Sequence, residues 1–348
     1  MRLLSVQDAL LFRFRLIIPA FCSNFVALNF KTTQKQFIHI MINRVIIRSK
    51  VVQVAYSYFI TENKSIAEAE NELLHSLEKG HELYYALLQL MIDLTDLQAQ
   101  RLETARNKYL PTPEERNPNM RFVRNRFIKH LRENEDFAAH YADKPFSWAI
   151  SAETFLNHLL DSILNTDEYQ SYMKSSIDDA EQDWELWRTL FKNVIAPSDE
   201  LTEAVENLSL YWNEELNVEA TFVLKTMKHF RNDSENAKML PMYKDDEDRK
   251  FALDLLHNTL ANEKLYRSYI DRFTKNWEIE RIAFMDVIIM LVAISELVRM
   301  PSIPTVVTLN EYIELAKTFS TEQSSHFING VLDAIVKELK KEGIINKD

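Results

Sequence analysis

The amino-acid sequence predicts an all-α protein, on three observations. The chain has 348 residues but only 3 glycines, too few for the many tight turns of an all-β fold. Long stretches are rich in Leu, Glu, Lys and Ala, which favour helices. Apolar residues also recur at helical spacing between breaks that fall at prolines. The length suits one large domain or two to three ordinary ones.

The first 40 residues differ from the rest of the chain. Residues 10–28 are rich in apolar side chains, but two arginines and Pro19 interrupt them, so they are too broken to span a membrane. A clearer helical pattern opens at Met41. We therefore expect residues 1–40 to be a non-native or disordered extension, with translation starting at Met41. A genuine, weakly ordered extension is the alternative.

Helices are expected from residue 44 onward. Residues 44–60 carry an apolar stripe at helical spacing, and leucines continue such a stripe through residues 65–109. Three prolines between residues 111 and 118 form the clearest break in the chain, and a second helical region follows over 120–240. Four of its aromatic residues are expected in a core, not around a ligand: Trp148, Trp184, Trp187 and Trp212.

The C-terminal third predicts four more helices. The first covers residues 251–273, and the second is an almost wholly apolar central helix over 282–298. Thr308 and Glu311 form a predicted capping box for the third, which runs to about Phe319. A polar loop over 320–325 precedes the last helix, which ends near residue 341.

Composition excludes several classes of enzyme. Three glycines cannot form a GxGxxG or GxxxxGK[ST] phosphate loop, and no GxSxG or HExxH motif is present. The single cysteine, Cys22, allows no internal disulfide and no cysteine cluster, and it suits a reducing cytoplasm. Glu72 and His75 have the spacing of a di-iron ligand pair, but they stand alone. We therefore expect no enzyme, no cofactor and no metal.

One short segment is basic in an otherwise acidic chain. The net charge is −11, whereas a simple non-specific nucleic-acid binder would be basic. Residues 41–61 nevertheless contain no acidic residue and carry Arg44, Arg48 and Lys50. The two arginines are four positions apart and share one helix face. Taken alone, this segment predicts either a solvated basic face or a local patch for phosphates.

Two regions resemble the NusB family. Residues 277–286 (WEIERIAFMD) are similar to its tryptophan, Glu-Arg pair and aspartate at the start of a central helix. Residues 309–319 (LNEYIELAKTF) and 327–333 (FINGVLD) resemble its INExxELAKxF and FVNGVLD elements, in the same order and spacing. Upstream, residues 52–57 (VQVAYS) resemble the end of the family's first helix.

The resemblance implies a NusB-like fold of two small helical subdomains with a large helical insertion. The N-terminal subdomain would combine residues 41–75 with 247–276, and the C-terminal subdomain would cover 277–348. Residues 76–246 would be the insertion, because family members are much shorter. We expect the insertion to fold into a bundle with an acidic surface, since Asp178, Asp179, Glu181 and Asp183 fall within six positions.

The resemblance also implies a function. The family binds boxA-type RNA together with the ribosomal protein NusE and joins an RNA polymerase antitermination complex in ribosomal RNA transcription. The implied protein is a cytoplasmic RNA-binding antitermination factor with no membrane association. A basic first helix would contact phosphates, and a basic ribosomal partner would supply the positive charge that the acidic chain lacks.

The resemblance implies two sets of site residues. The RNA-binding set comprises Arg44, Arg48, Lys50, Gln53, Tyr56, Phe319, Gln323, Ser324 and Phe327. The partner-binding set comprises Glu280 and Asp286, whose negative charge suits a basic ribosomal protein.

The sequence departs from the family pattern at several positions. Three positions of the arginine-rich motif are Val45, Ile46 and Ile47 here, and Ser295 replaces a usual tyrosine of the central helix. These departures bear on RNA affinity and on the geometry of partner binding more than on membership of the family. The alternative function is a helical protein-interaction scaffold whose insertion carries the main role.

Overall fold

A computed structural model describes residues 44–61, 65–212, 215–232, 237–243, 245–274 and 283–347. Every regular element in these segments is a helix, and the predicted all-α fold is confirmed. The chain divides into two compact units. Unit 1 comprises the described residues up to Leu77 together with those from Tyr243 onward, and unit 2 comprises Glu78 to Met242.

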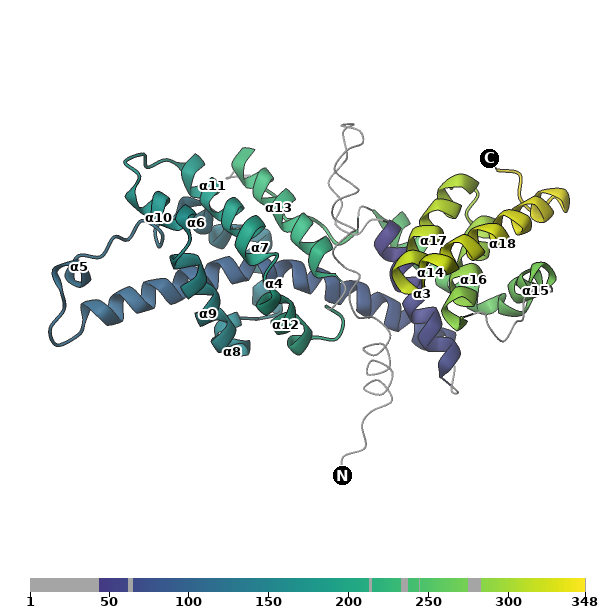
Figure 1. Cartoon of the computed structure of the whole chain (residues 1–348), viewed down its shortest axis with the longest axis horizontal. Coiled ribbons are helices and arrows are strands. Elements are labelled where there is room, and N and C mark those ends of the chain that lie inside the picture. The colour runs from purple at the N-terminus through teal and green to yellow at the C-terminus, as the bar shows by residue number, and fades with distance from the viewer. Residues whose placement is uncertain are drawn as a thin grey trace, which may run out of the picture. The chain divides into compact units, whose positions relative to one another are not determined.

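Unit 1 contains the first and the last helices of the described chain (Figure 1). They are α3 (Arg44–Ile60), the beginning of α4 (Ile66–Arg106), α14 (Asp246–Ala261), α15 (Glu263–Phe273), α16 (Phe284–Arg299), α17 (Thr305–Phe319) and α18 (Glu322–Lys341).

The centre of unit 1 is α16, which contacts α3, α14, α15, α17 and α18. Its residues from Ile288 to Leu297 are all buried, as expected for a helix that is apolar on every side. The predicted central helix is therefore confirmed. Three polar residues are buried with it: Asp286, Ser295 and Glu296. Buried polar groups need partners, and Glu296 in particular requires other side chains to reach the centre of the unit.

Three predicted boundaries in unit 1 are wrong. Residues 251–273 form two helices, because the chain breaks at Asn262 between α14 and α15. Helix α17 begins at Thr305, directly after Pro304, so Thr308 lies inside the helix and is not its N-cap. The last loop is shorter than expected, because Thr321 caps α18 by accepting a hydrogen bond from the backbone N–H of Ser324 at 3.0 Å.

Unit 2 is built from short helices and the greater part of α4 (Figure 1). The others are α5 (Pro113–Arg116), α6 (Arg126–Glu133), α7 (Glu135–Asp143), α8 (Trp148–Ser151), α9 (Glu153–Leu164), α10 (Asp167–Lys174), α11 (Ala180–Leu190), the π-helix η1 (Phe191–Ile195), α12 (Asp199–Leu208) and α13 (Leu216–Asn232).

The core of unit 2 is rich in aromatic side chains. The four tryptophans expected in a core are all buried, which confirms that prediction. Trp148 is wholly buried, and its Nε1 donates to the backbone oxygen of Ala86 on α4 at 2.7 Å. Trp184 does the same to the backbone oxygen of Met227 at 2.7 Å. The rings of Trp148 and Trp184 therefore each join two helices while their polar N–H groups remain satisfied.

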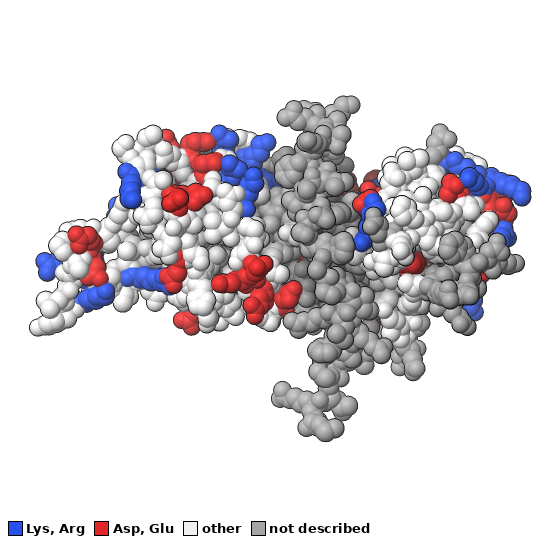
Figure 2. Space-filling model, viewed as in Figure 1, with Lys and Arg blue, Asp and Glu red and all other residues white. Residues whose placement is uncertain are grey.

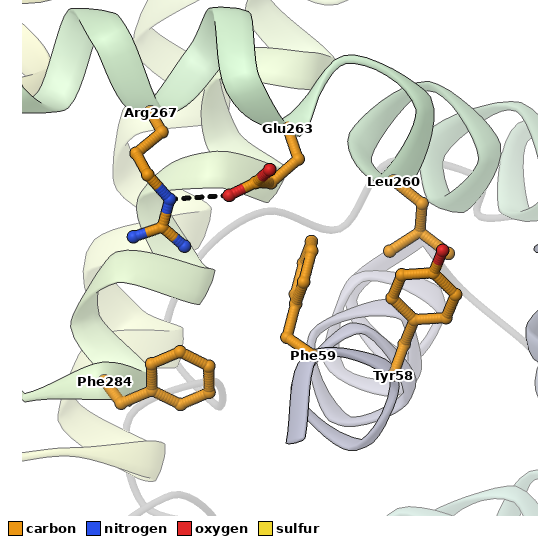
Figure 3. Close-up of a pocket in the computed structure, with 6 residues that line it drawn as sticks. All are labelled: Tyr58, Phe59, Leu260, Glu263, Arg267 and Phe284. Carbon is orange, nitrogen blue, oxygen red and sulfur yellow. Dashed lines mark hydrogen bonds and ion pairs between the residues drawn. The ribbon is translucent and has the colours of Figure 1, made fainter. Parts of the chain in front are cut away.

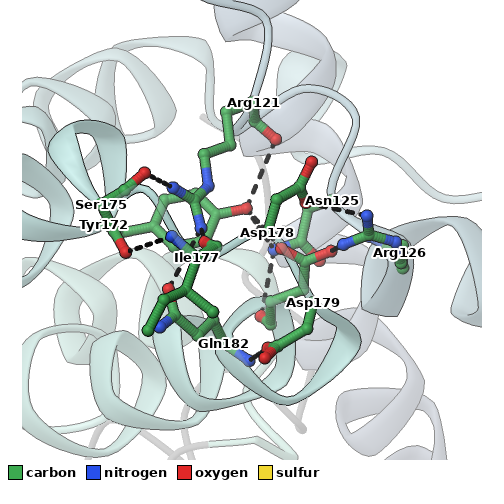
Figure 4. Close-up of polar contacts among 10 residues, drawn as sticks. Arg121, Asn125, Arg126, Tyr172, Ser175, Ile177, Asp178, Asp179 and Gln182 are labelled. Carbon is green, nitrogen blue, oxygen red and sulfur yellow. Dashed lines mark hydrogen bonds and ion pairs between the residues drawn. The ribbon is translucent and has the colours of Figure 1, made fainter.

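Of the acidic cluster that predicted an acidic surface on the insertion, Asp178, Asp179 and Glu181 are exposed and Asp183 is not. Asp183 is buried and accepts hydrogen bonds from the backbone N–H and the Nη1 of Arg126 at 3.0 and 2.9 Å. Asp178 binds the other end of the same guanidinium, and Asp179 caps α11 (Figure 4). Glu181 forms an ion pair with Arg231. On the face in Figure 2, acidic and basic residues are interspersed over unit 2.

Among the helices of the described segments, none combines the length and the apolar character that crossing a bilayer demands.

Candidate functional site

The two arginines of α3 lie in different environments. Arg48 is 3% exposed and forms a two-pronged ion pair with Glu296 of α16, with Nε and Nη2 at 2.7 and 3.0 Å from the two carboxylate oxygens. The side chain of Arg44 is 38% exposed, and its Nε lies 3.3 Å from the carboxylate of Asp248 on α14. Only Arg44 of the two is therefore available at the surface.

Glu296 is the centre of a buried polar network. Besides Arg48, it accepts hydrogen bonds from the hydroxyl groups of Thr308 and Tyr312 on α17, at 2.9 and 3.1 Å. The Nη1 atom of Arg48 also lies 3.5 Å from Glu311. Helix α3 is therefore joined to α16 and α17 through one guanidinium group.

The network favours the charged form of Arg48. Burial alone would lower the pKa of Arg48, but the hydrogen bonds and the negative charge of Glu296 outweigh burial and raise it. Burial, together with the charge of Glu296, also raises the pKa of Tyr312. The arginine is therefore permanently charged and the tyrosine hydroxyl remains a donor.

Phe251 of α14 lies beside both arginines. Its ring is buried, and the guanidinium carbons of Arg44 and Arg48 lie 4.9 and 5.6 Å from the ring centroid. Such distances allow cation–π attraction, which is stronger when the cation is shielded from water. The ring therefore connects the exposed arginine with the buried one.

The structure does not place all the expected RNA-binding residues at the surface. Arg48 and Lys50 are 3% and 5% exposed, so neither presents its charge to a phosphate in this structure. Arg48 is buried because the carboxylate of Glu296, which is also buried, requires a cation. Phe319 is also buried.

The remaining RNA-binding candidates are exposed or half-buried. Gln53 and Tyr56 are half-buried on α3, and Ser324 and Phe327 are half-buried on α18. Gln323 is exposed in the first turn of α18. Gln53 and Tyr56 lie on α3, and the ion pairs of Arg48 with Glu296 and Glu311 join α3 to α16 and α17. Helix α17 directly precedes α18, which carries Ser324 and Phe327.

The partner-binding candidates are only partly described. Glu280 lies outside the described residues. Asp286 lies in the first turn of α16 and is 4% exposed, so it is not the surface charge that the sequence analysis expected. Among the described residues, its Oδ1 atom has no hydrogen-bond partner.

An open pocket of about 320 Å³ lies on the same unit and includes Phe284, two residues before Asp286 in the sequence (Figure 3). Its walls come from the ends of α3, α14, α15 and α16: Tyr58, Phe59, Leu260, Glu263, Arg267 and Phe284. Glu263 and Arg267 form an ion pair on its rim at 2.6 Å. The ring of Phe284, which is 39% exposed, also lies 5.5 Å from that of Tyr56. An aromatic pocket with a charged rim suits a side chain of a protein partner.

Sequence reasoning missed the groups that surround Arg48. A signal was present, because Glu296 is a carboxylate within an almost wholly apolar helix and a buried carboxylate requires a cation. The basic segment at residues 44–50 was the natural source of that cation. Phe251 gave no comparable signal, since an apolar residue on a helix face is ordinary core.

The described fold and this site define an all-helical protein in which α3 is tied to the buried central helix α16 by an arginine–glutamate pair. The NusB family profile matches residues 215–337. No solved structure matches the chain significantly.

Several curated relatives are named transcription antitermination protein NusB. That of Acetivibrio thermocellus is 31% identical over 138 residues, which cover 39% of this chain and 95% of the relative. Those of Chloroherpeton thalassium and Natranaerobius thermophilus are 35% and 41% identical, over 28% and 25% of this chain. The matches cover only 47% and 63% of the length of these two relatives.

The chain belongs to the NusB family. The resemblance found in the sequence is therefore confirmed, and with it the NusB-like helical fold. Unit 2 lies mostly outside the family profile, which begins at residue 215.

Proposed function

We propose that this protein is a cytoplasmic, non-enzymatic transcription antitermination factor that binds boxA-type RNA together with ribosomal protein NusE. In this proposal it joins the RNA polymerase antitermination complex during ribosomal RNA transcription. The observation that carries the proposal is the match over 95% of a relative named for transcription antitermination.

The surface of unit 1 supports an RNA contact. Arg44 exposes part of its guanidinium group at the start of α3, and Gln323 is exposed at the start of α18. The first turn of a helix offers backbone N–H groups to an anion, although Thr321 already satisfies that of Ser324. We propose Arg44, Gln53, Tyr56, Gln323, Ser324 and Phe327 as the RNA surface.

The test is binding of labelled single-stranded boxA RNA by the purified chain, alone and with NusE, at several salt concentrations. Replacing Arg44 with Gln should weaken binding and reduce the salt slope by about 0.7. Arg299→Gln is the matched control, since Arg299 is exposed at the far end of α16. If the native chain with NusE prefers boxA RNA no more than a scrambled RNA, the proposal is wrong.

We propose that NusE binds at the aromatic pocket that includes Phe284. Phe284 is the pocket residue to change, because it lines the pocket and is 39% exposed. Phe284→Ala should weaken NusE binding while the melting temperature stays nearly unchanged. Val307→Ala is the control, since Val307 is a similarly exposed apolar residue on α17. If the two substitutions weakened NusE binding equally, this result would argue against the pocket as the NusE-binding site.

Asp286 needs a gentler change than a charge reversal, because it is buried. Asp286→Asn keeps the shape of the side chain and removes its charge. Slower association with NusE at unchanged thermal stability would support a role in partner binding. A collapse of stability with unchanged association would make the residue structural.

A second candidate function is a protein-interaction scaffold that acts through unit 2. The loop after α4 exposes two large apolar side chains, Tyr109 at 97% and Leu110 at 79%. The loop is held by a capping box between Thr112 and Glu115, and by an ion pair of Lys108 with Glu115 at 2.6 Å. Tyrosine is enriched at the energetic centres of protein interfaces, so a fixed loop that displays Tyr109 suits a protein contact.

Deletion of residues 78–242, with a short linker in their place, separates the two functions. If the shortened chain folds and binds RNA with NusE as the full chain does, unit 2 is an accessory to antitermination. If it folds but loses binding, the main function depends on unit 2. An insoluble product would show that the two units cannot be separated, and that the proposed division into family fold and insertion is wrong.

A further inference from the structure

We propose that Arg48 is a positioning residue for RNA binding: it holds Arg44 in place through Phe251 and does not itself contact RNA. This inference rests on the proposed RNA-binding function. Of the two arginines on this face of α3, Arg44 would contact RNA at the surface, and Arg48 would position it from the interior of unit 1.

The burial of Arg48 rules out a direct contact in this structure. It is 3% exposed, and Nε and Nη2 are both directed at Glu296, which is itself fully buried. A phosphate could reach this guanidinium only after the ion pair separated. Separation would leave the carboxylate of Glu296 buried without a cation, which is strongly unfavourable.

Glu296 is fixed in turn by the elements around it. Thr308 and Tyr312 donate to its carboxylate from α17. At the same turn of α16, the Nζ atom of Lys347 donates to the backbone oxygens of Glu296 and Met300, at 3.1 and 2.8 Å. Both the side chain and the backbone of Glu296 are therefore held, so the orientation of Arg48 is set by a rigid acceptor.

Phe251 transmits that orientation to Arg44. The guanidinium carbon of Arg48 lies 5.6 Å from the centroid of the buried Phe251 ring, and that of Arg44 lies 4.9 Å from the same centroid. Arg44 is also paired with Asp248, one helical turn before Phe251 on α14. A shift of Phe251 would therefore move the surface on which Arg44 rests.

Lysine at position 48 distinguishes positioning from direct contact. A lysine keeps the charge, so a residue that only supplied charge to a phosphate would tolerate it. It cannot form the two parallel bonds to Glu296, and its ammonium group does not reproduce the flat guanidinium beside Phe251. Arg48→Lys thus disturbs the geometry while leaving the net charge unchanged.

The experiment is a double-mutant cycle on the full chain with NusE, measured by fluorescence anisotropy of labelled boxA RNA against salt concentration. We expect Arg44→Gln to reduce the salt slope by about 0.7 and to weaken binding severalfold. We expect Arg48→Lys to do nearly the same, although it removes no charge. The double variant should bind no more weakly than Arg44→Gln alone, because the second change has no contact left to disturb.

Three outcomes would overturn the proposal. One is an Arg48→Lys variant with the native slope and affinity. Another is a double variant in which the two losses add. A third concerns Arg48→Gln combined with Glu296→Gln, which removes both buried charges and guards against unfolding. If this pair lowers the slope by a further 0.7 or so in the Arg44→Gln background, Arg48 contacts phosphate directly. Arg299→Lys should change nothing.

A measurement without RNA separates this inference from the proposed function. The NMR signal of the Arg44 side-chain Nε–H is expected to be displaced by the ring current of Phe251. In Arg48→Lys it should move toward the position of a free arginine. An unmoved signal would overturn the positioning role whether or not the protein binds RNA. A moved signal in a chain that does not bind boxA RNA would support the coupling and overturn the proposed function alone.

Discussion

The two units bury carboxylates in different ways. In unit 1, Glu296 is neutralised by side chains, chiefly Arg48, which lies 248 positions earlier in the chain. In unit 2, the buried carboxylate of Asp93 accepts the backbone N–H of Trp148 at 2.6 Å, in the first turn of α8, whose N-cap is Ser147. Asp183 likewise accepts a backbone N–H, that of Arg126 at 3.0 Å, and also pairs with the guanidinium of that residue at 2.9 Å.

This difference shows where each unit is vulnerable. A carboxylate that caps a helix interacts with dipoles that remain in place whatever side chains are changed nearby. A carboxylate paired with a distant cation depends on one residue, and removal of that residue leaves a buried charge. Unit 1 should therefore respond sharply to a single substitution, and unit 2 more gradually.

The largest expected effect is on unit 1. Arg48→Ala should lower its free energy of unfolding by about 3–5 kcal/mol, because Glu296 is left buried without its cation. Hydrogen exchange measured by mass spectrometry on α16 peptides reports unit 1, and α11 peptides report unit 2. Exchange should rise in α16 alone, and Arg299→Ala should leave both units unchanged. A loss below about 1 kcal/mol would mean that the pair is not the main link of unit 1.

The next effect concerns acid and unit 2. Burial lowers the pKa of His81 to about 4, while its Nε2 lies 3.3 Å from the backbone oxygen of Leu240. Between pH 6.5 and 4 the unfolded chain takes up a proton that the folded unit does not. His81 therefore contributes stability that is present above pH 6.5 and is lost as the pH falls toward 4, on the order of 3 kcal/mol.

Urea unfolding of native protein and His81→Gln between pH 4 and 7 would measure this contribution. The variant should show a flatter dependence of unit 2 stability on pH. Part of the dependence of stability on pH should persist in the variant, because burial also lowers the pKa of His140. The His140 ring stacks on Tyr85 and lies next to His81 and Lys144. Parallel curves for the two proteins would contradict the prediction.

A smaller effect is expected at the buried carboxylate of unit 2. Asp93→Ala removes the acceptor for Trp148 and for the hydroxyl of Ser147, and should cost about 1–3 kcal/mol in unit 2 stability. Asp93→Asn, which keeps one acceptor oxygen, should cost less. A loss as large as that of Arg48→Ala would remove the distinction between the two units.

The smallest effect belongs to surface charge. Arg132 pairs with Asp96 at 2.6 Å, but both side chains are about half exposed. Arg132→Gln should change the stability of unit 2 by less than about 1 kcal/mol and should become neutral in high salt. Chemical denaturation at two salt concentrations tests this. A large, salt-independent loss would show that surface pairs also hold unit 2.

Sequence patterns predicted the helices better than their ends. The apolar pattern of α16 and the buried tryptophans of unit 2 followed from periodicity, because burial imposes that pattern on the sequence. The break at Asn262 did not, since that region reads as continuous helix. The start of α17 at Thr305 did not either, because the apparent capping box at Thr308 indicated a later start. Local capping preferences were overridden at Thr308, whose hydroxyl is used by Glu296.

The candidate site was harder to predict than the fold. A basic run on one helix face can point to solvent or into the unit, and sequence spacing alone does not distinguish the two. Helical spacing places Arg44 and Arg48 on one face of α3, but the exposed fractions of their side chains differ. The difference arises from Glu296, which pairs with Arg48 from 248 positions away in the chain, so the spacing within α3 does not reveal it.

The separation between Arg48 and Glu296 has a consequence during synthesis. At about 5–20 residues per second, a ribosome that has made the arginine needs roughly 12–50 s to reach its acidic partner. All of unit 2 is made in that interval, so its core can form while α3 still lacks the helices that bury it. Until α16 is complete, the nascent α3 exposes its apolar face and an uncompensated arginine. The order of translation therefore makes the unit that begins first the one that finishes last.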